Sequence, residues 1–157
     1  MPSIHEKLSA LGLKLPSASA PAANYVPFSV SGTHVYIAGQ LPKQEDGSFL
    51  HKGHLGGDIT IEQGYEAARL VGLHLLAQLL AACQGDEARI VRCLKLGGFV
   101  QAMPEFTQHP EVINGASDLL VAVLGDAGRH ARFAVGVASI PRGCCVEIDA
   151  IFEIRPA

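Results

Sequence analysis

Charge is scarce in this chain of 157 residues, of which only 17% are Asp, Glu, Lys or Arg, and no stretch gathers Lys and Arg into a cluster. Nucleic-acid binding depends on phosphate neutralisation, so a net charge of −3 argues against an RNA or DNA partner. No apolar run approaches the ~20 residues of a membrane span, and Met1–Glu6 lacks the features of a secretory signal. These absences predict a cytoplasmic protein that binds neither nucleic acid nor membrane.

Cysteine pairs with redox or metal-binding spacing are missing as well. The four cysteines are Cys83, Cys93, Cys144 and Cys145. None forms a C-x-x-C pattern, so we expect reduced thiols that pack as small apolar side chains, with a redox role for the adjacent pair as the less favoured alternative. His51 and His54 lie in one polar loop but have no third ligand at a recognisable spacing, which argues against a metal site.

What the chain does have is apolar residues, which make up 48% of it. A length of 157 residues predicts one domain, 1–157, that buries about two thirds of its unfolded surface. The apolar excess is more than such a core needs, and part of it is expected to cover a subunit interface.

Three helices are predicted from their end signals. Capping boxes at Ser3–Glu6 and Thr60–Gln63 open a short N-terminal helix, ending near Gly12, and a long one that runs to about residue 83. Pro110 suits the first turn of a second long helix, which closes at Gly125.

Five strands are predicted from period-2 apolar runs, at 25–30, 33–38, 90–100, 130–138 and 145–154. The first two flank Ser31-Gly32 and form a hairpin. Together with the helices, this order predicts an α+β fold in which two long helices pack on one face of a mixed sheet.

The last two strands are predicted to form a second hairpin, around a turn at 140–143. In that register Arg132 and Glu147 project from the uncovered face, about 13 Å apart, and Phe133 and Val135 point to the helices. Direct cooperation of Arg132 with Glu147 would then require a neighbouring chain. From spacing alone, such an Arg and Glu are more often an interface ion pair than a catalytic set.

Several motifs resemble one known family. Ser31-Gly32, Gly39-Gln40-Leu41-Pro42, Asn114, Ala131-Arg132 and Val146-Glu147-Ile148-Asp149-Ala150-Ile151 resemble, in order and separation, the RidA/YjgF family of reactive intermediate deaminases. The resemblance covers residues 25–154, the core, and leaves 1–20 as an N-terminal extension. It implies a chorismate-mutase-like fold, a homotrimer with ligand sites in the clefts between subunits, and hydrolysis of imines or enamines of amino acids to 2-keto acids and ammonia. It also implies that no metal or organic cofactor is used.

By position, the resemblance assigns the grip on the substrate carboxylate to Arg132 and the place beside the attacking water to Glu147. It places Tyr25, Gly39 and Asn114 along the cleft. The residue types suit this chemistry, because a guanidinium offers two parallel donors to a carboxylate and a partly buried glutamate can act as a base near neutral pH.

One position departs from the family pattern. Many deaminase members carry a cysteine two residues after the arginine, where this chain has Ala134. This departure motivates an alternative function, a non-catalytic trimer that binds small carboxylates. Some family members carry the labels endoribonuclease or translation inhibitor, and the acidic charge balance makes that reading the least favoured.

Overall fold

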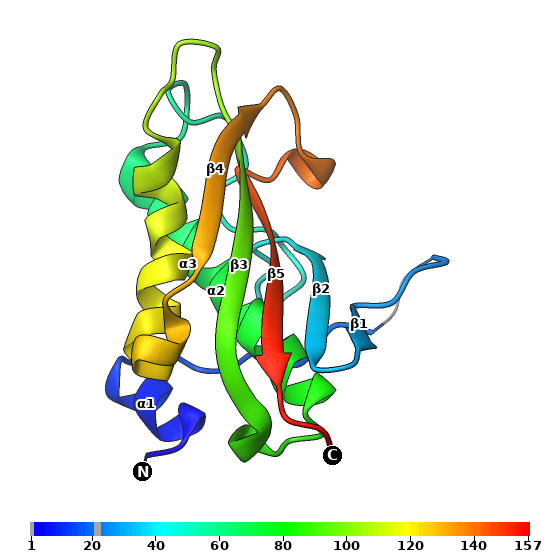
Figure 1. The fold of residues 1–157 in the computed structure, drawn as a ribbon. Coiled ribbons are helices and arrows are strands. Elements are labelled where there is room, and N and C mark those ends of the chain that lie inside the picture. Colours follow the sequence, from blue (N-terminus) through cyan, green and yellow to red (C-terminus); the bar gives the residue numbers. More distant parts are fainter. Residues whose placement is uncertain (1, 21–22) are drawn as a thin grey trace.

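The computed structural model describes residues 2–20 and 23–157, and Figure 1 traces them from blue to red. The helices are α1 (Ile4–Ala10), α2 (Ile61–Ala82) and α3 (His109–Leu124). The strands are β1 (Phe28–Ser31), β2 (His34–Gln40), β3 (Ile90–Gln101), β4 (Ala131–Val137) and β5 (Val146–Ile154). Short 3-10 turns lie at η1 (Glu87–Arg89), η2 (Gly125–Gly128) and η3 (Pro141–Gly143). Among the described residues, no helix has the length and apolar character needed to cross a bilayer.

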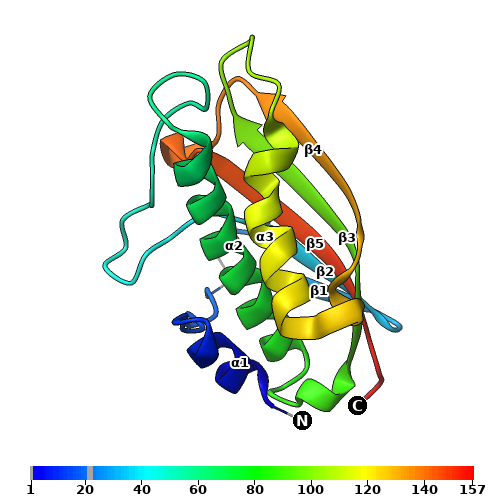
Figure 2. The same ribbon diagram turned by 90° about the vertical axis from the view of Figure 1, so that its left-hand side faces the viewer.

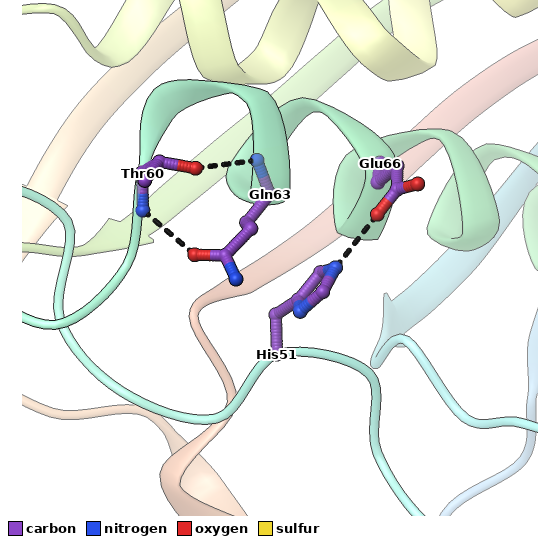
Figure 3. A network of polar contacts seen from close by, with 4 residues as sticks. All are labelled: His51, Thr60, Gln63 and Glu66. Carbon is purple, nitrogen blue, oxygen red and sulfur yellow. Dashed lines mark hydrogen bonds and ion pairs between the residues drawn. The ribbon is translucent and has the colours of Figure 1, made fainter.

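The expected helix starts are confirmed atom by atom. At α2, the Thr60 hydroxyl accepts from the Gln63 amide at 3.1 Å and the Gln63 side chain accepts from the Thr60 amide at 2.9 Å (Figure 3). At α1, Ser3 and Glu6 form the same reciprocal pair. Figure 3 also shows His51 against Glu66, a contact of 2.7 Å that fastens the loop before α2 to the helix.

The sheet has the strand order β1-β2-β5-β3-β4. The first hairpin is confirmed, with Ser31 opposite His34, although β1 begins at Phe28 rather than at residue 25. Strand β5 is antiparallel to both of its neighbours, β2 and β3, while β3 and β4 run parallel. As Figure 2 shows, α2 and α3 lie side by side against one face of this mixed sheet, as expected.

The predicted C-terminal hairpin is wrong, because β3 lies between β4 and β5. The unit β3-α3-β4 is a parallel crossover, in which a helix must carry the chain back before the next strand can pair in the same direction. The succession of a strand at 90–100, a helix from Pro110 and a strand at 130–138 is the sequence signal for this unit. The segment 138–145, with its Pro/Gly turn, crosses the end of β3 instead of closing a tight turn.

This correction also reverses the expected faces of β4. Arg132 and Ala150 are both in register with Leu96, which is fully buried under the helices. Glu147 is in register with Phe99, three residues further along β3, and therefore lies on the opposite face. In a single chain, Arg132 faces the helix layer and Glu147 faces the open side of the sheet.

Two glycines allow close contacts between α2, α3 and the sheet. A Cβ added at Gly115 of α3 would collide with the carbonyl oxygen of Tyr65 on α2, and one at Gly98 of β3 would lie 2.7 Å from Ile113. Small residues at these crossings let α2, α3 and the sheet approach to contact distance. The register shifts in β3 fall before Gly98, between residues 90 and 95.

Helix α1 packs at one end of the α2/α3 pair. Ile4 and Leu8 of α1 are buried, the Lys7 ammonium donates to the Val123 carbonyl at 2.8 Å, and the Ile4 amide donates to Glu87. Figure 2 shows α1 at the end of the helix pair, away from the sheet.

Candidate functional site

Arg132 lies on the edge strand β4 with its side chain against α3. Its Nη1 donates to the Asn114 side-chain oxygen at 2.9 Å and to the Ser117 hydroxyl at 3.0 Å. Asn114 and Ser117 are three residues apart and so share one face of the helix. The structure thus brings together two of the predicted site residues, Arg132 and Asn114, and adds Ser117.

This anchoring leaves one edge of the guanidinium free. The two hydrogens of Nη1 are used by Asn114 and Ser117, so Nε and Nη2 remain as a parallel pair of donors. Within residues 2–20 and 23–157, Arg132 has no carboxylate partner at ion-pair distance. A half-buried cation with an oriented, unused pair of donors matches the geometry of an incoming carboxylate.

Glu147 lies on the open face of β5, beside Gly39 of the neighbouring strand β2. A Cβ at Gly39 would lie 2.6 Å from Glu147 Oε1, so the absence of a side chain leaves room for the carboxylate. Burial raises the pKa of Glu147, and the negative charge of Asp149 raises it further. A carboxylate with a raised pKa accepts a proton more readily than an ordinary glutamate does.

Asp149 and Lys95, which are not among the predicted site residues, extend the polar part of this face. Burial raises the pKa of Asp149, while a backbone hydrogen bond from Gly97 and the charge of Lys95 oppose that rise. The Lys95 ammonium lies 5.6 Å from the centre of the Phe133 ring. The alternation of Glu147 and Asp149 along β5 was the sequence signal that could have found the second carboxylate.

Tyr25 lies next to the start of β1 with 59% of its surface exposed. Together with Gly39 it lines a cavity of about 290 Å³, whose wall includes Pro27, Gln40 and His74. Tyr25 and Gly39 therefore line one cavity within the chain.

The predicted residues thus form two groups within one chain. Arg132 and Asn114 lie on the helix side at β4, while Glu147 and Gly39 lie on the open face at β5 and β2, with Tyr25 at the rim of the cavity beside Gly39. Strands β5 and β4 are separated by β3, a distance of about 10 Å at ~4.8 Å per strand. A single chain does not bring the two groups to one ligand.

A larger cavity of about 1020 Å³ adjoins this one, with His74 in the wall of both, and lies between residues 13–20, the loop at 43–50 and α2. It contains none of the predicted site residues. Two of its charged residues, Lys14 and Glu45, form an ion pair at 3.5 Å. His74 in its wall donates from Nε2 to the Lys43 carbonyl oxygen at 2.8 Å. Because a carbonyl only accepts, that ring nitrogen carries the proton.

The loop histidines and the cysteines take structural positions. His51 contacts Glu66, and His54 Nε2 lies 3.0 Å from the Ala138 carbonyl oxygen. In the described parts of the chain, no group of three His, Cys, Asp or Glu side chains is placed to hold a metal ion. All four cysteines are free and buried, and burial raises the pKa of both Cys93 and Cys145 to about 12, which makes these thiols poor nucleophiles.

Comparison with known proteins places this geometry in a family. Residues 5–151 match the family model described as "YjgF/chorismate mutase-like, putative endoribonuclease". The chain is 47% identical to Protein TCP17 of Trypanosoma cruzi over 149 residues, which cover 94% of this chain and 92% of that protein.

Solved structures agree. The crystal structure of protein Atu1372 from Agrobacterium tumefaciens is 48% identical to this chain and has a TM-score of 0.91. The match covers 97% of this chain and 92% of that chain. RidA from the Antarctic bacterium Psychrobacter sp. PAMC 21119 is 26% identical, with 88% of this chain and 94% of that chain covered and a TM-score of 0.57. The family match and the shared five-stranded architecture lead to one conclusion: this chain belongs to the YjgF/RidA family and has its chorismate-mutase-like α+β fold.

Proposed function

We propose that this protein is a hydrolytic deaminase of 2-imino acids or enamines derived from amino acids. The observation that carries the proposal is the guanidinium of Arg132, which is held by Asn114 and Ser117 and has its Nε and Nη2 edge unoccupied by any described carboxylate. Such an edge binds the substrate carboxylate and fixes the position of the adjacent C=N carbon. Membership of a family that contains a protein named RidA supports this activity.

The proposed chemistry needs a water and a base. Glu147 accepts a proton as the water oxygen bonds to the imine carbon, and the tetrahedral carbinolamine forms. That proton passes to the imine nitrogen, and Glu147 then takes the proton of the new hydroxyl group and passes it to the same nitrogen as the C–N bond breaks, so that ammonia and a 2-keto acid leave. The raised pKa of Glu147 suits this shuttle, and no step requires a thiol at the position of Ala134.

We further propose that the complete site forms between the subunits of a homotrimer, with Arg132 from one chain and Glu147 from its neighbour. The separation of the two groups in one chain supports this arrangement. So does the open face of the sheet, where Tyr36 and Val135 are 47% and 43% exposed. The reduced state of the four buried cysteines supports a cytoplasmic location.

The test is to generate 2-imino acids in place with an amino-acid oxidase and to follow their decay. Wild type should accelerate decay and ammonia release, Arg132→Ala should lose on the order of 100-fold or more in kcat/KM, and Arg132→Lys should recover little because it lacks the paired donors. Equal rates for wild type and Arg132→Ala, with both proteins folded, would refute the role of Arg132.

A second candidate is a non-catalytic trimer that binds small carboxylates in the same clefts. Its specific support is Ala134, which stands where many deaminase members have cysteine. Saturable binding of pyruvate by wild type, with no accelerated decay of any imine, would favour this function. An endoribonuclease activity is supported by the family's description. The sequence has no cluster of Lys and Arg to bind the phosphates of RNA, which makes this function the least favoured.

A further inference from the structure

Two residues outside the predicted set support Arg132. The Ser117 hydroxyl lies 3.0 Å from Arg132 Nη1 and 2.9 Å from His130 Nε2. The other ring nitrogen of His130, Nδ1, lies 2.6 Å from the Gly128 carbonyl oxygen. These contacts make a continuous chain from the backbone of η2, through His130 and Ser117, to the guanidinium.

The directions of the hydrogens in this chain follow from the chemistry of its two ends. A carbonyl oxygen only accepts, so His130 Nδ1 donates to Gly128. The guanidinium only donates, so the Ser117 oxygen accepts from Arg132. The Ser117 hydrogen is then free to point at Nε2, which is an acceptor in a neutral imidazole. Burial and the charge of Arg132 lower the pKa of His130, and the hydrogen bond to Gly128 opposes them only in part. The lowered pKa agrees with a neutral ring.

Two hydrogen-bond acceptors, Asn114 and Ser117, restrict the orientation of the Arg132 guanidinium more than one acceptor would. With Asn114 alone, Nη1 could turn about a single hydrogen bond, and the Nε and Nη2 edge would turn with it. The Ser117 oxygen takes the second hydrogen of Nη1 and fixes the plane of the group. Its lone pair stays directed at Arg132 because its own hydrogen is held by His130.

We propose that Ser117 and His130 are positioning residues that orient Arg132 for carboxylate binding. The proposal rests on the proposed function, since it assigns a role in the same site. The spacings agree with it: Ser117 is one helical turn after Asn114, and His130 is two residues before Arg132 and so projects from the same side of the chain.

The tautomer of His130 gives a test that does not depend on activity. Nitrogen-15 spectra at neutral pH should show His130 as the neutral, Nδ1-protonated form. In Ser117→Ala the signal of Nε2 should change, because its donor is lost. A ring protonated on Nε2 alone would overturn the proposed chain of hydrogen bonds.

The functional test measures substrate affinity separately from turnover. Ser117→Ala should raise KM about five- to tenfold, the effect of one orienting hydrogen bond, with a smaller change in kcat. It should weaken the binding of pyruvate, a stable 2-keto acid, by a similar factor in calorimetry. Ser117→Thr, which keeps the hydroxyl, should restore most of the affinity. The matched control is Ser9→Ala, the same substitution at an exposed position of α1, which should match wild type.

Variants of the histidine complete the design. His130→Phe leaves the Ser117 hydroxyl without its acceptor and should weaken pyruvate binding, whereas His130→Gln keeps an acceptor oxygen and should weaken it less. If Ser117→Ala and His130→Phe are folded and bind pyruvate as the Ser9→Ala control does, while Arg132→Ala does not bind, the positioning proposal is wrong and the proposed function stands. If Arg132→Ala also binds and turns over normally, the proposed function itself fails.

Discussion

At the residue scale, what distinguishes the site is where each charge lies relative to its neighbours. Arg132 has polar anchors but no described carboxylate partner, while Asp149, two residues from Glu147 on the same strand, raises the pKa of Glu147 further than burial alone does. Both arrangements are unfavourable for an isolated chain and favourable for a ligand that brings a carboxylate and a water. These environments support the roles in binding and proton transfer that we propose for Arg132 and Glu147.

Glu147→Gln tests the role of this carboxyl group in proton transfer. We expect turnover to fall on the order of 100-fold, because the amide cannot accept the proton of the attacking water. The matched control is Glu105→Gln, an exposed loop residue, which should retain activity and pH profile. A Glu147→Gln variant with the full rate and the pH profile of wild type would show that Glu147 is structural.

The same substitution has a consequence for stability. The pKa of Glu147 is raised in the folded state, so between its ordinary value of 4.5 and the folded value the native protein holds more protons than the unfolded chain. Stability therefore falls as pH rises through that window. Glu147→Gln should be more stable than wild type at pH 7 without ligand, and the difference should vanish below pH 4.5. Thermal unfolding from pH 4 to 8 measures this difference, and a variant less stable at pH 7 would contradict the expectation.

At the scale of elements, close crossings decide which strand and helix faces meet. Helix α3 approaches α2 at Gly115 and the sheet at Gly98, and the same helix presents Asn114 and Ser117 to Arg132. Gly115, which permits the contact with α2, directly follows Asn114 and lies two residues before Ser117. The position of the guanidinium depends on the packing of α3 as much as on its own strand.

Gly115→Ala should destabilise the protein by about 2–3 kcal/mol, even though alanine favours a helix over glycine by about 1 kcal/mol. The new Cβ meets the Tyr65 backbone, which cannot turn away. Gly39→Ala is the matched comparison, because its Cβ meets only the end of the flexible Glu147 side chain. It should cost less than about 1 kcal/mol but lower activity, since Glu147 must move. Urea unfolding and imine decay measure the two effects, and equal stability losses would contradict this account.

At the scale of the whole molecule, the sheet has one covered face and one open face. The helices bury Leu96, Ile148 and Phe152, whereas Phe99 and Phe133 pack edge-to-face on the other side, with a ring separation of 5.3 Å. An open face that combines aromatic residues with Glu147 and Asp149 suits a partner that is itself apolar and cationic in part. A second copy of the chain provides both.

We expect the protein to be a trimer at micromolar concentration in light scattering. Val135→Asp places a charge on the open face and should dissociate the trimer and abolish turnover. Leu11→Asp is the control, because Leu11 is 50% exposed but follows α1 at the end of the helix layer. A monomeric wild type, or a trimer undisturbed by Val135→Asp, would contradict the proposed assembly.

Mixed trimers test whether the site is shared. If Arg132 and Glu147 of one cleft come from different chains, co-refolding the inactive variants Arg132→Ala and Glu147→Gln should restore about one quarter of the clefts. The expected result is activity in the mixture that neither variant has alone. Native mass spectrometry should first verify that mixed trimers form. No recovered activity in verified mixed trimers would mean that each chain supplies its own Arg132 and Glu147 to one cleft.

Local signals predicted most of the elements correctly. Helix starts at residues 4 and 61, the end of α3 before Gly125 and the first hairpin were readable because caps, prolines and two-residue turns act within a few residues of chain. The motifs at Gly39 and at Arg132 also identified the family, which the comparisons confirmed. These properties depend on short-range chemistry and on residue order.

Only the tertiary structure decided which strands pair and which way their side chains face. Two strands joined by a Pro/Gly segment look like a hairpin, but β3 inserts between them because α3 carries the chain back to pair in parallel. This insertion turns Arg132 toward the helices, where Asn114 and Ser117 hold it, and leaves Glu147 on the other face. A period-2 pattern fixes that alternate residues share a face, but which face is buried depends on contacts far apart in the chain.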